Sequence, residues 1–130
     1  MTDVRLDNRL REMNFGDWEN RPWDDIPRRE LDAWGKDYAR RAVPGGESFA
    51  DLNERTLEFW DELRDSNGKD ARIIVFSHAG PIRCMLTHVL GMPVTHTFRL
   101  KVDYGGRSLL ALGGNDQEAT YVRYINRVMD

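Results

Sequence analysis

The stretch that decides the fold is Arg72-Ile73-Ile74-Val75-Phe76-Ser77-His78-Ala79-Gly80-Pro81. The apolar residues from Ile73 to Phe76 are consecutive, and continuous apolarity without alternation is typical of a strand covered on both faces in a parallel sheet. Pro81 suits the first turn of a helix, which is expected to run to Leu90 and to end at Gly91. A buried strand that leads directly into a helix predicts an α/β protein.

A first helix is expected upstream of this stretch, from Pro27 to Arg41. Pro27 can occupy its first position, and Leu31, Trp34 and Tyr38 follow at helical spacing. Because residues three or four apart share one face of a helix, these three side chains are predicted to pack together on the core.

A second helix is expected to begin at Phe49, because Ser48-Phe49-Ala50-Asp51 has the form of a capping box. Asn67-Gly68 is expected to end it. Its apolar residues recur at helical spacing and predict a buried stripe, whereas its charged residues, Arg55 among them, are predicted to face water.

The pattern changes to that of strands downstream of these helices. Phe98, Leu100 and Val102 alternate with other residues, Leu109–Leu112 is continuously apolar, and Thr120–Ile125 follows. Glycine-containing turns separate these segments. We therefore expect a mostly parallel sheet with helices on both faces and an antiparallel meander at its edge.

Length and composition exclude several classes of protein. A chain of 130 residues fits a single domain, residues 1–130. The formal net charge is −3 and the arginines are scattered among the acids, which argues against nucleic-acid binding. No apolar run is long enough for a membrane span, and no segment has the pattern of a signal peptide. With Cys84 as its single cysteine, the sequence predicts a cytoplasmic protein without disulfides.

His78 is the first candidate for a functional residue. It follows the expected strand and precedes the expected helix, which is where open α/β sheets place their ligand sites. A helix N-terminus offers unpaired N–H groups to an anion, and His78 can donate a hydrogen bond to a phosphate or a carboxylate. The alternative is that His78 only caps the turn.

Two acidic residues in loops are further candidates. Glu12 lies in a loop with two aromatic residues, Phe15 and Trp18, whose rings can hold the loop in place, as a general acid requires. The alternative is a solvated acid without a role. Glu47 follows Pro44-Gly45-Gly46. Taken by itself, its position favours a structural role, in which its negative charge stabilises the start of the next helix through the helix dipole.

Three segments, in this order, resemble one family. They are Leu10-Arg11-Glu12-x-x-Phe15-Gly16-x-Trp18-Glu19, then Gly45-Gly46-Glu47-Ser48, then Ser77-His78-Ala79-Gly80-Pro81-Ile82-Arg83. This combination is similar to the histidine phosphatase superfamily, which has the phosphoglycerate-mutase-like fold. The fuller match, with Val102-Asp103-Tyr104-Gly105, resembles the branch that contains α-ribazole phosphatases and broad-specificity sugar-phosphate phosphatases.

The resemblance implies a two-step phosphoryl transfer that uses no metal and no cofactor. A histidine takes the phosphoryl group of a small phosphorylated metabolite, other pocket residues hold it, and a carboxylic acid protonates the leaving oxygen. Glu12 matches this proton donor, and His78 matches the second histidine of the phosphate pocket. Glu47 and Ser48 match a segment that lines the entrance of the pocket, and the Ala79 backbone can add an N–H to the phosphate of the substrate or to inorganic phosphate. Trp18 lies close to the proposed site in the sequence and is expected to contact substrate.

The chain departs from this family in its N-terminal part. Members begin with a strand that ends in Arg-His-Gly and supplies the nucleophile and a phosphate-binding arginine, whereas the only histidines here are His78, His88 and His96. The resemblance therefore implies an N-terminally truncated domain that is inactive on its own. We expect a homodimer through the exposed edge of the Ile73–Phe76 strand. The alternative is a non-catalytic, anion-binding or self-assembling remnant of the fold.

Overall fold

The computed structural model describes residues 3–66, 70–113 and 119–129. Its α-helices are α1 (Arg28–Gly35), α2 (Phe49–Ser66) and α3 (Ala79–Val89). Short 3-10 helices occur at η1 (Asn8–Leu10), η2 (Gly16–Trp18), η3 (Trp23–Asp25) and η4 (Val94–Arg99). Two strands, β1 (Arg107–Ala111) and β2 (Tyr121–Arg127), pair antiparallel.

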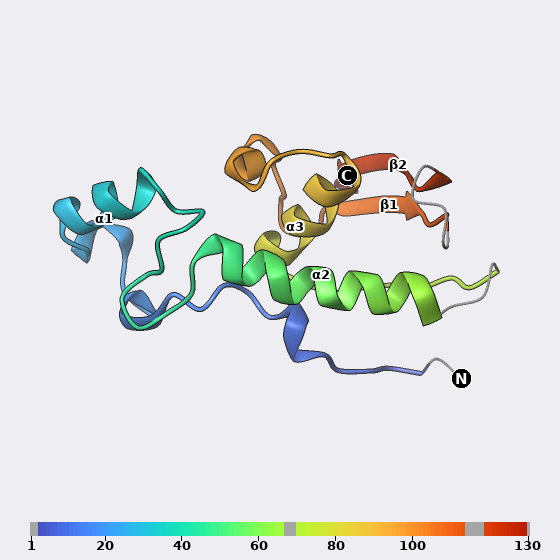
Figure 1. Cartoon of the computed structure of the whole chain (residues 1–130), viewed down its shortest axis with the longest axis horizontal. Coiled ribbons are helices and arrows are strands. Elements are labelled where there is room, and N and C mark those ends of the chain that lie inside the picture. Colours follow the sequence, from blue (N-terminus) through green and yellow to red (C-terminus); the bar gives the residue numbers. More distant parts are fainter. Residues whose placement is uncertain (1–2, 67–69, 114–118, 130) are drawn as a thin grey trace.

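Helix α2 runs along the long axis of the molecule, and the other elements are arranged around it (Figure 1). It packs against α3, and α3 in turn contacts η4 and β2. The α1 region forms the opposite end of the molecule from the β1–β2 pair (Figure 1). Within the described ranges, no helix is both long enough and apolar enough to cross a membrane.

One buried cluster joins the loops of the N-terminal half to α2 and α3. Partly buried aromatic residues of α1 and its neighbours pack against this cluster. Its buried members are Met13, Trp18, Ile26, Val43, Phe49, Leu52 and Cys84. Because Met13 is one of them, the residue before it, Glu12, is anchored to the core through the chain itself.

The expected start of α2 is confirmed. The helix begins at Phe49; the Ser48 hydroxyl accepts a hydrogen bond from the Asp51 N–H at 3.1 Å, and the Asp51 carboxylate accepts one from the Ser48 N–H at 2.9 Å. These reciprocal bonds are those of a capping box. The end expected at Asn67-Gly68 lies outside the described residues.

The expected course of α3 is also confirmed. Pro81 lies in its first turn, and Leu90 follows its last residue as the C-cap. Gly91 has a φ of +66°, the left-handed conformation in which glycine commonly ends a helix.

Helix α1 is shorter than expected, since it ends at Gly35 and not at Arg41. The carbonyls of Tyr38 and Ala39 accept hydrogen bonds from the N–H groups of Phe49 and Ala50, at 3.1 and 2.8 Å. These bonds join the chain after α1 to the first turn of α2, and they take the place of a continued helix.

The expectation of a buried strand at Ile73–Phe76 is wrong for this chain. The segment forms no strand, and Ile74 and Phe76 are 81% and 89% exposed. A strand depends on neighbours that complete its hydrogen bonds, and in the described part of the chain the only paired strands are β1 and β2. The apolar run is therefore an unpaired segment between α2 and α3.

The antiparallel edge is confirmed in part. The pair of β1 and β2 occupies the last two expected segments, although part of the turn between them lies outside the described residues. The strand expected at Phe98, Leu100 and Val102 is wrong, because Val94–Arg99 forms η4. The buried Thr97 hydroxyl donates to the Val94 carbonyl at 2.6 Å, a local bond that competes with strand pairing.

Candidate functional site

Glu12 lies at the N-terminus of α3. Its Oε2 accepts a hydrogen bond from the Gly80 N–H at 3.2 Å, and its Oε1 accepts one from the Met13 N–H at 2.9 Å. The Ser77 hydroxyl donates to the Leu10 carbonyl at 2.7 Å and ties the same two segments together a second time. The segments that carry Glu12 and His78 are therefore adjacent in space, although they are far apart in the sequence.

His78 is the residue that immediately precedes α3 and serves as its N-cap position. Its side chain makes no capping hydrogen bond and is exposed, so the ring itself does not cap the helix. Ala79 is the first residue of the helix, where backbone N–H groups have no partner within the helix. His78 and the Ala79 N–H thus both belong to the partly positive end of α3.

The carboxylate of Glu47 is fully engaged with its neighbours. It accepts hydrogen bonds from Arg55 Nε at 2.7 Å, from Arg55 Nη2 at 3.0 Å and from the Asn14 N–H at 2.8 Å. Burial raises the pKa of Glu47, but the hydrogen bonds from Arg55 and Asn14 outweigh this effect and keep the pKa below its usual value. Glu47 is therefore an ionised tether between its own loop, the Glu12 loop and α2.

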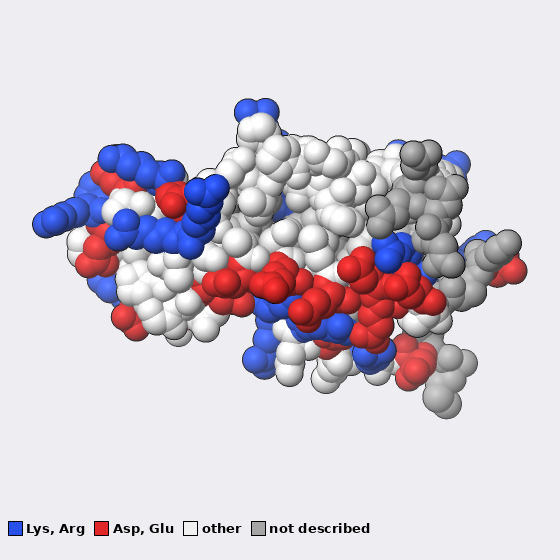
Figure 2. Space-filling view, viewed as in Figure 1, with Lys and Arg blue, Asp and Glu red and all other residues white. Residues whose placement is uncertain are grey.

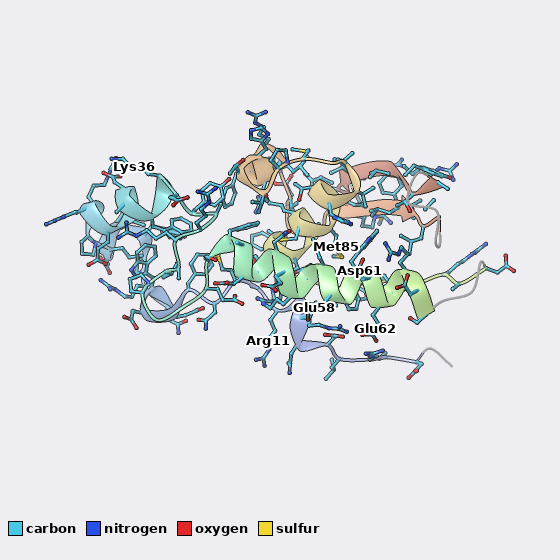
Figure 3. All side chains as sticks on the ribbon, in the orientation of Figure 1. Arg11, Lys36, Glu58, Asp61, Glu62 and Met85 are labelled. Carbon is cyan, nitrogen blue, oxygen red and sulfur yellow. The ribbon has the colours of Figure 1, made fainter. Side chains whose placement is uncertain are left out.

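Glu12 and Glu47 line the same open hollow, which has a volume of about 450 Å³. Arg11, which lies below α2 in the view of Figure 3, also lines this hollow and is exposed. No hydrogen bond or ion pair from the Arg11 side chain is found within the described ranges, so its charge is available to an anion. The remaining lining residues are Asn8, Met13, Asn14, Glu19 and Arg55.

Ser48 and Trp18 occupy different surroundings from Glu12. Ser48 is buried and its hydroxyl caps α2. Trp18 is buried in an aromatic cluster, with ring centroids 6.5 Å from Trp23 and 5.8 Å from Trp34. It lines a second hollow that shares Glu19 with the first. Contact of Ser48 or Trp18 with a substrate stays a prediction.

The other two histidines and Cys84 lie outside the first turn of α3. His88 is exposed and its ring centroid lies 6.3 Å from that of Trp60, while His96 belongs to η4. Cys84 is completely buried, and burial raises the pKa of its thiol to about 12. In the described part of the chain, His78 is thus the only histidine at the N-terminus of α3.

Arg55 belongs to the candidate site, although its place among the charged residues of α2 predicted that it faces water. Its side chain is only 22% exposed and it lines the hollow with Glu12 and Glu47. The spacing of the sequence already indicated partial burial of Arg55. It is three residues after Leu52 and four before Phe59, so it borders the apolar stripe of α2.

Comparison with known proteins identifies the family. Residues 1–125 match the family model described as the histidine phosphatase superfamily (branch 1). The adenosylcobalamin/alpha-ribazole phosphatase of Escherichia coli K12 is 28% identical over 126 residues, which are 95% of this chain and 60% of that protein. A glucosyl-3-phosphoglycerate phosphatase of Mycolicibacterium vanbaalenii is 35% identical over 101 residues, 70% of this chain and 44% of that protein.

Solved structures show the same similarity. The alpha-ribazole phosphatase of Shigella flexneri is 27% identical with a TM-score of 0.82, over 96% of this chain and 61% of that one. A mycobacterial glucosyl-3-phosphoglycerate phosphatase in complex with inorganic phosphate is 27% identical with a TM-score of 0.76, over 97% and 66%.

The chain spans 60% or less of the length of the two relatives compared by sequence. The structural neighbours confirm the expected phosphoglycerate-mutase-like α/β fold, and the described part of this chain contains helices and a small antiparallel sheet. The match over residues 1–125 shows that the chain belongs to the histidine phosphatase superfamily (branch 1).

Proposed function

We propose that this chain supplies the proton donor and one phosphate-holding histidine of a phosphomonoesterase site. The single observation that carries the proposal is the position of the Glu12 carboxylate, which is bonded to Gly80 in the first turn of the helix that His78 precedes. A helix N-terminus with an exposed imidazole favours an anion, and a carboxyl group beside it can protonate a leaving oxygen.

Each residue has a separate role in this reaction. The imidazole of His78 and the Ala79 N–H hold the phosphoryl oxygens and stabilise the charge that develops on them. Glu12 gives its proton to the ester oxygen as the O–P bond breaks, because an alkoxide is a poor leaving group. The phosphoryl group passes to a nucleophilic histidine, and water later releases it as phosphate. The substrate is a small phosphorylated metabolite, such as α-ribazole phosphate or a sugar phosphate.

The nucleophile must come from outside the residues described at this site. His78 occupies the proposed phosphate-holding position, whereas His88 lies in the last turn of α3 and His96 lies in η4. Since binding groups cannot replace a nucleophile in a covalent mechanism, we expect the isolated chain to bind phosphate without hydrolysing an ester. Phosphate binding without hydrolysis is the behaviour of an anion-binding module, which is the second candidate function for the chain on its own.

Two further parts of the proposal concern the state of the chain. We propose a homodimer through the exposed Ile73–Phe76 segment, whose backbone makes no hydrogen bond within the described ranges. The single partial domain and the cytoplasmic location stay predictions.

A titration with inorganic phosphate, followed by the backbone amide signals of the chain, tests the proposed site. We expect saturable shifts of the Ala79 amide in the unmodified chain and in His88→Ala, the matched control. We expect no saturation in His78→Ala. Equal shifts in His78→Ala and the unmodified chain, or shifts that avoid the start of α3, would contradict the assignment.

A further inference from the structure

The side chain of Arg55, on α2, holds the Glu12 loop through hydrogen bonds to main-chain carbonyls of that loop. Its Nη1 donates to the carbonyls of Arg9 at 2.8 Å and Arg11 at 2.9 Å, and its Nη2 donates to the carbonyl of Glu12 at 3.0 Å. Nε and Nη2 also bind the Glu47 carboxylate. A guanidinium group has five N–H donors, and these five hydrogen bonds use all of them.

We propose that Arg55 is the positioning residue for Glu12, an inference that rests on the proposed role of Glu12 as proton donor. Arg55 does not touch the carboxylate of Glu12; it holds the carbonyl of the same residue. The carbonyl and the carboxylate share one Cα, so fixing the main chain on α2 sets the distance from which the side chain reaches Gly80. A proton donor needs such a fixed position.

The planar shape of the guanidinium is essential to this role. The donors of a guanidinium group lie in one plane as a rigid fork. This fork bonds three main-chain carbonyls and one carboxylate at the same time. A lysine offers three donors from one point on a flexible stem. It can keep the charge beside Glu47 but cannot bridge all the acceptors, so we expect Arg55→Lys to restore the position of Glu12 only in part.

A second tether keeps the N-terminal segment on α2 without Arg55. Arg9 donates to Glu62 at 2.7 Å and Arg5 donates to the same carboxylate at 2.9 Å. Glu62 lies on the side of α2 that faces this segment (Figure 3). Loss of Arg55 should therefore loosen the Glu12 loop while the segment before it stays attached.

The amide proton of Gly80 measures the position of Glu12 directly, and it does so without turnover. The hydrogen bond to the Glu12 carboxylate contributes to the position of the Gly80 signal, so adding Glu12→Ala, which removes the acceptor, moves this signal only where the bond is formed. We expect the movement to be lost in Arg55→Met and reduced in Arg55→Lys. The matched control is Arg64→Met, because Arg64 lies on the same helix and is paired with Asp61 and Asp65 instead of the loop.

The outcomes distinguish positioning from simple stabilisation. If Arg55→Met lowers the melting temperature but adding Glu12→Ala still moves the Gly80 signal as in the unmodified chain, the proposal is wrong. If the movement is lost in Arg55→Met while the amide signals of α3 beyond its first turn remain in place, and Arg64→Met keeps the movement, the proposal holds. Failure of the phosphate titration would overturn the proposed function and leave this result unaffected.

Discussion

Glu12 can reach α3 because residue 80 is a glycine. A Cβ at this position would meet the Glu12 carboxylate, and it would lie 2.9 Å from Cδ2 of the fully buried Leu52. The carboxylate is the end of a flexible side chain and can move, whereas Leu52 is enclosed by the core. A methyl group at position 80 therefore competes for the place that Glu12 occupies.

We predict that Gly80→Ala displaces Glu12 and lowers the free energy of unfolding by about 1–3 kcal/mol, the usual cost of an added methyl group in a packed region. Urea denaturation measures this loss. Gly35→Ala is the matched control, because nothing lies within 4 Å of its added Cβ, and alanine is the better helix former. Unchanged stability in Gly80→Ala would contradict the packing described around Glu12.

The candidate residues could be predicted from the sequence only where a motif marks them. Glu12, His78 and Ala79 lie in segments that resemble the family, and the structure brings these segments together. Arg55 could not be predicted in the same way, because three of its five acceptors are backbone carbonyls, and any sequence provides these. Its exposure depends on which loop crosses α2, which is a property of the tertiary structure.

At the scale of elements, Ser48 acts as the N-cap of α2, and its hydroxyl bond to Asp51 holds the first turn. We predict that Ser48→Ala lowers the free energy of unfolding by about 1 kcal/mol, the typical cost of losing an N-cap acceptor. Urea denaturation of Ser48→Asp is the control, since aspartate supplies an acceptor at the same position. A loss in Ser48→Asp as large as that in Ser48→Ala would contradict the capping role.

Local signals predicted the helices better than they predicted the strands. The capping box of α2 and Gly91 after α3 act within a few residues; both helices begin close to the expected positions, and α3 also ends where expected. Ile73–Phe76 has the composition of a buried strand, but pairing needs partners that the described part of the chain does not supply. The η4 helix replaces another expected strand because Thr97 bonds locally.

At the scale of the whole molecule, charge and apolar surface are unevenly distributed. Acidic side chains form a row along α2 (Figure 2), and the exposed charged residues of the helix include Glu54, Glu58 and Asp61. Ile74 and Phe76, in contrast, present apolar surface to solvent. Exposed apolar side chains on an unpaired backbone favour association with another segment of the same kind.

We predict that the chain forms a dimer through this segment and that Phe76→Lys shifts it toward the monomer, because a charge would be buried at the contact. Sedimentation velocity at several concentrations measures the change. Tyr104→Lys is the matched control, since Tyr104 is also fully exposed but lies in another loop. A monomer at all concentrations for the unmodified chain would contradict this prediction.

The most direct test of the account is the hydrolysis of p-nitrophenyl phosphate by the purified chain beside Glu12→Ala and His78→Ala. We expect no turnover by the unmodified chain above that of the two variants, because Glu12 is the proposed proton donor and His78 the proposed phosphate-holding residue, and we propose no nucleophile among the described residues of the site. Turnover by the unmodified chain that both substitutions abolish would contradict the account, since the chain would then complete the phosphatase site by itself.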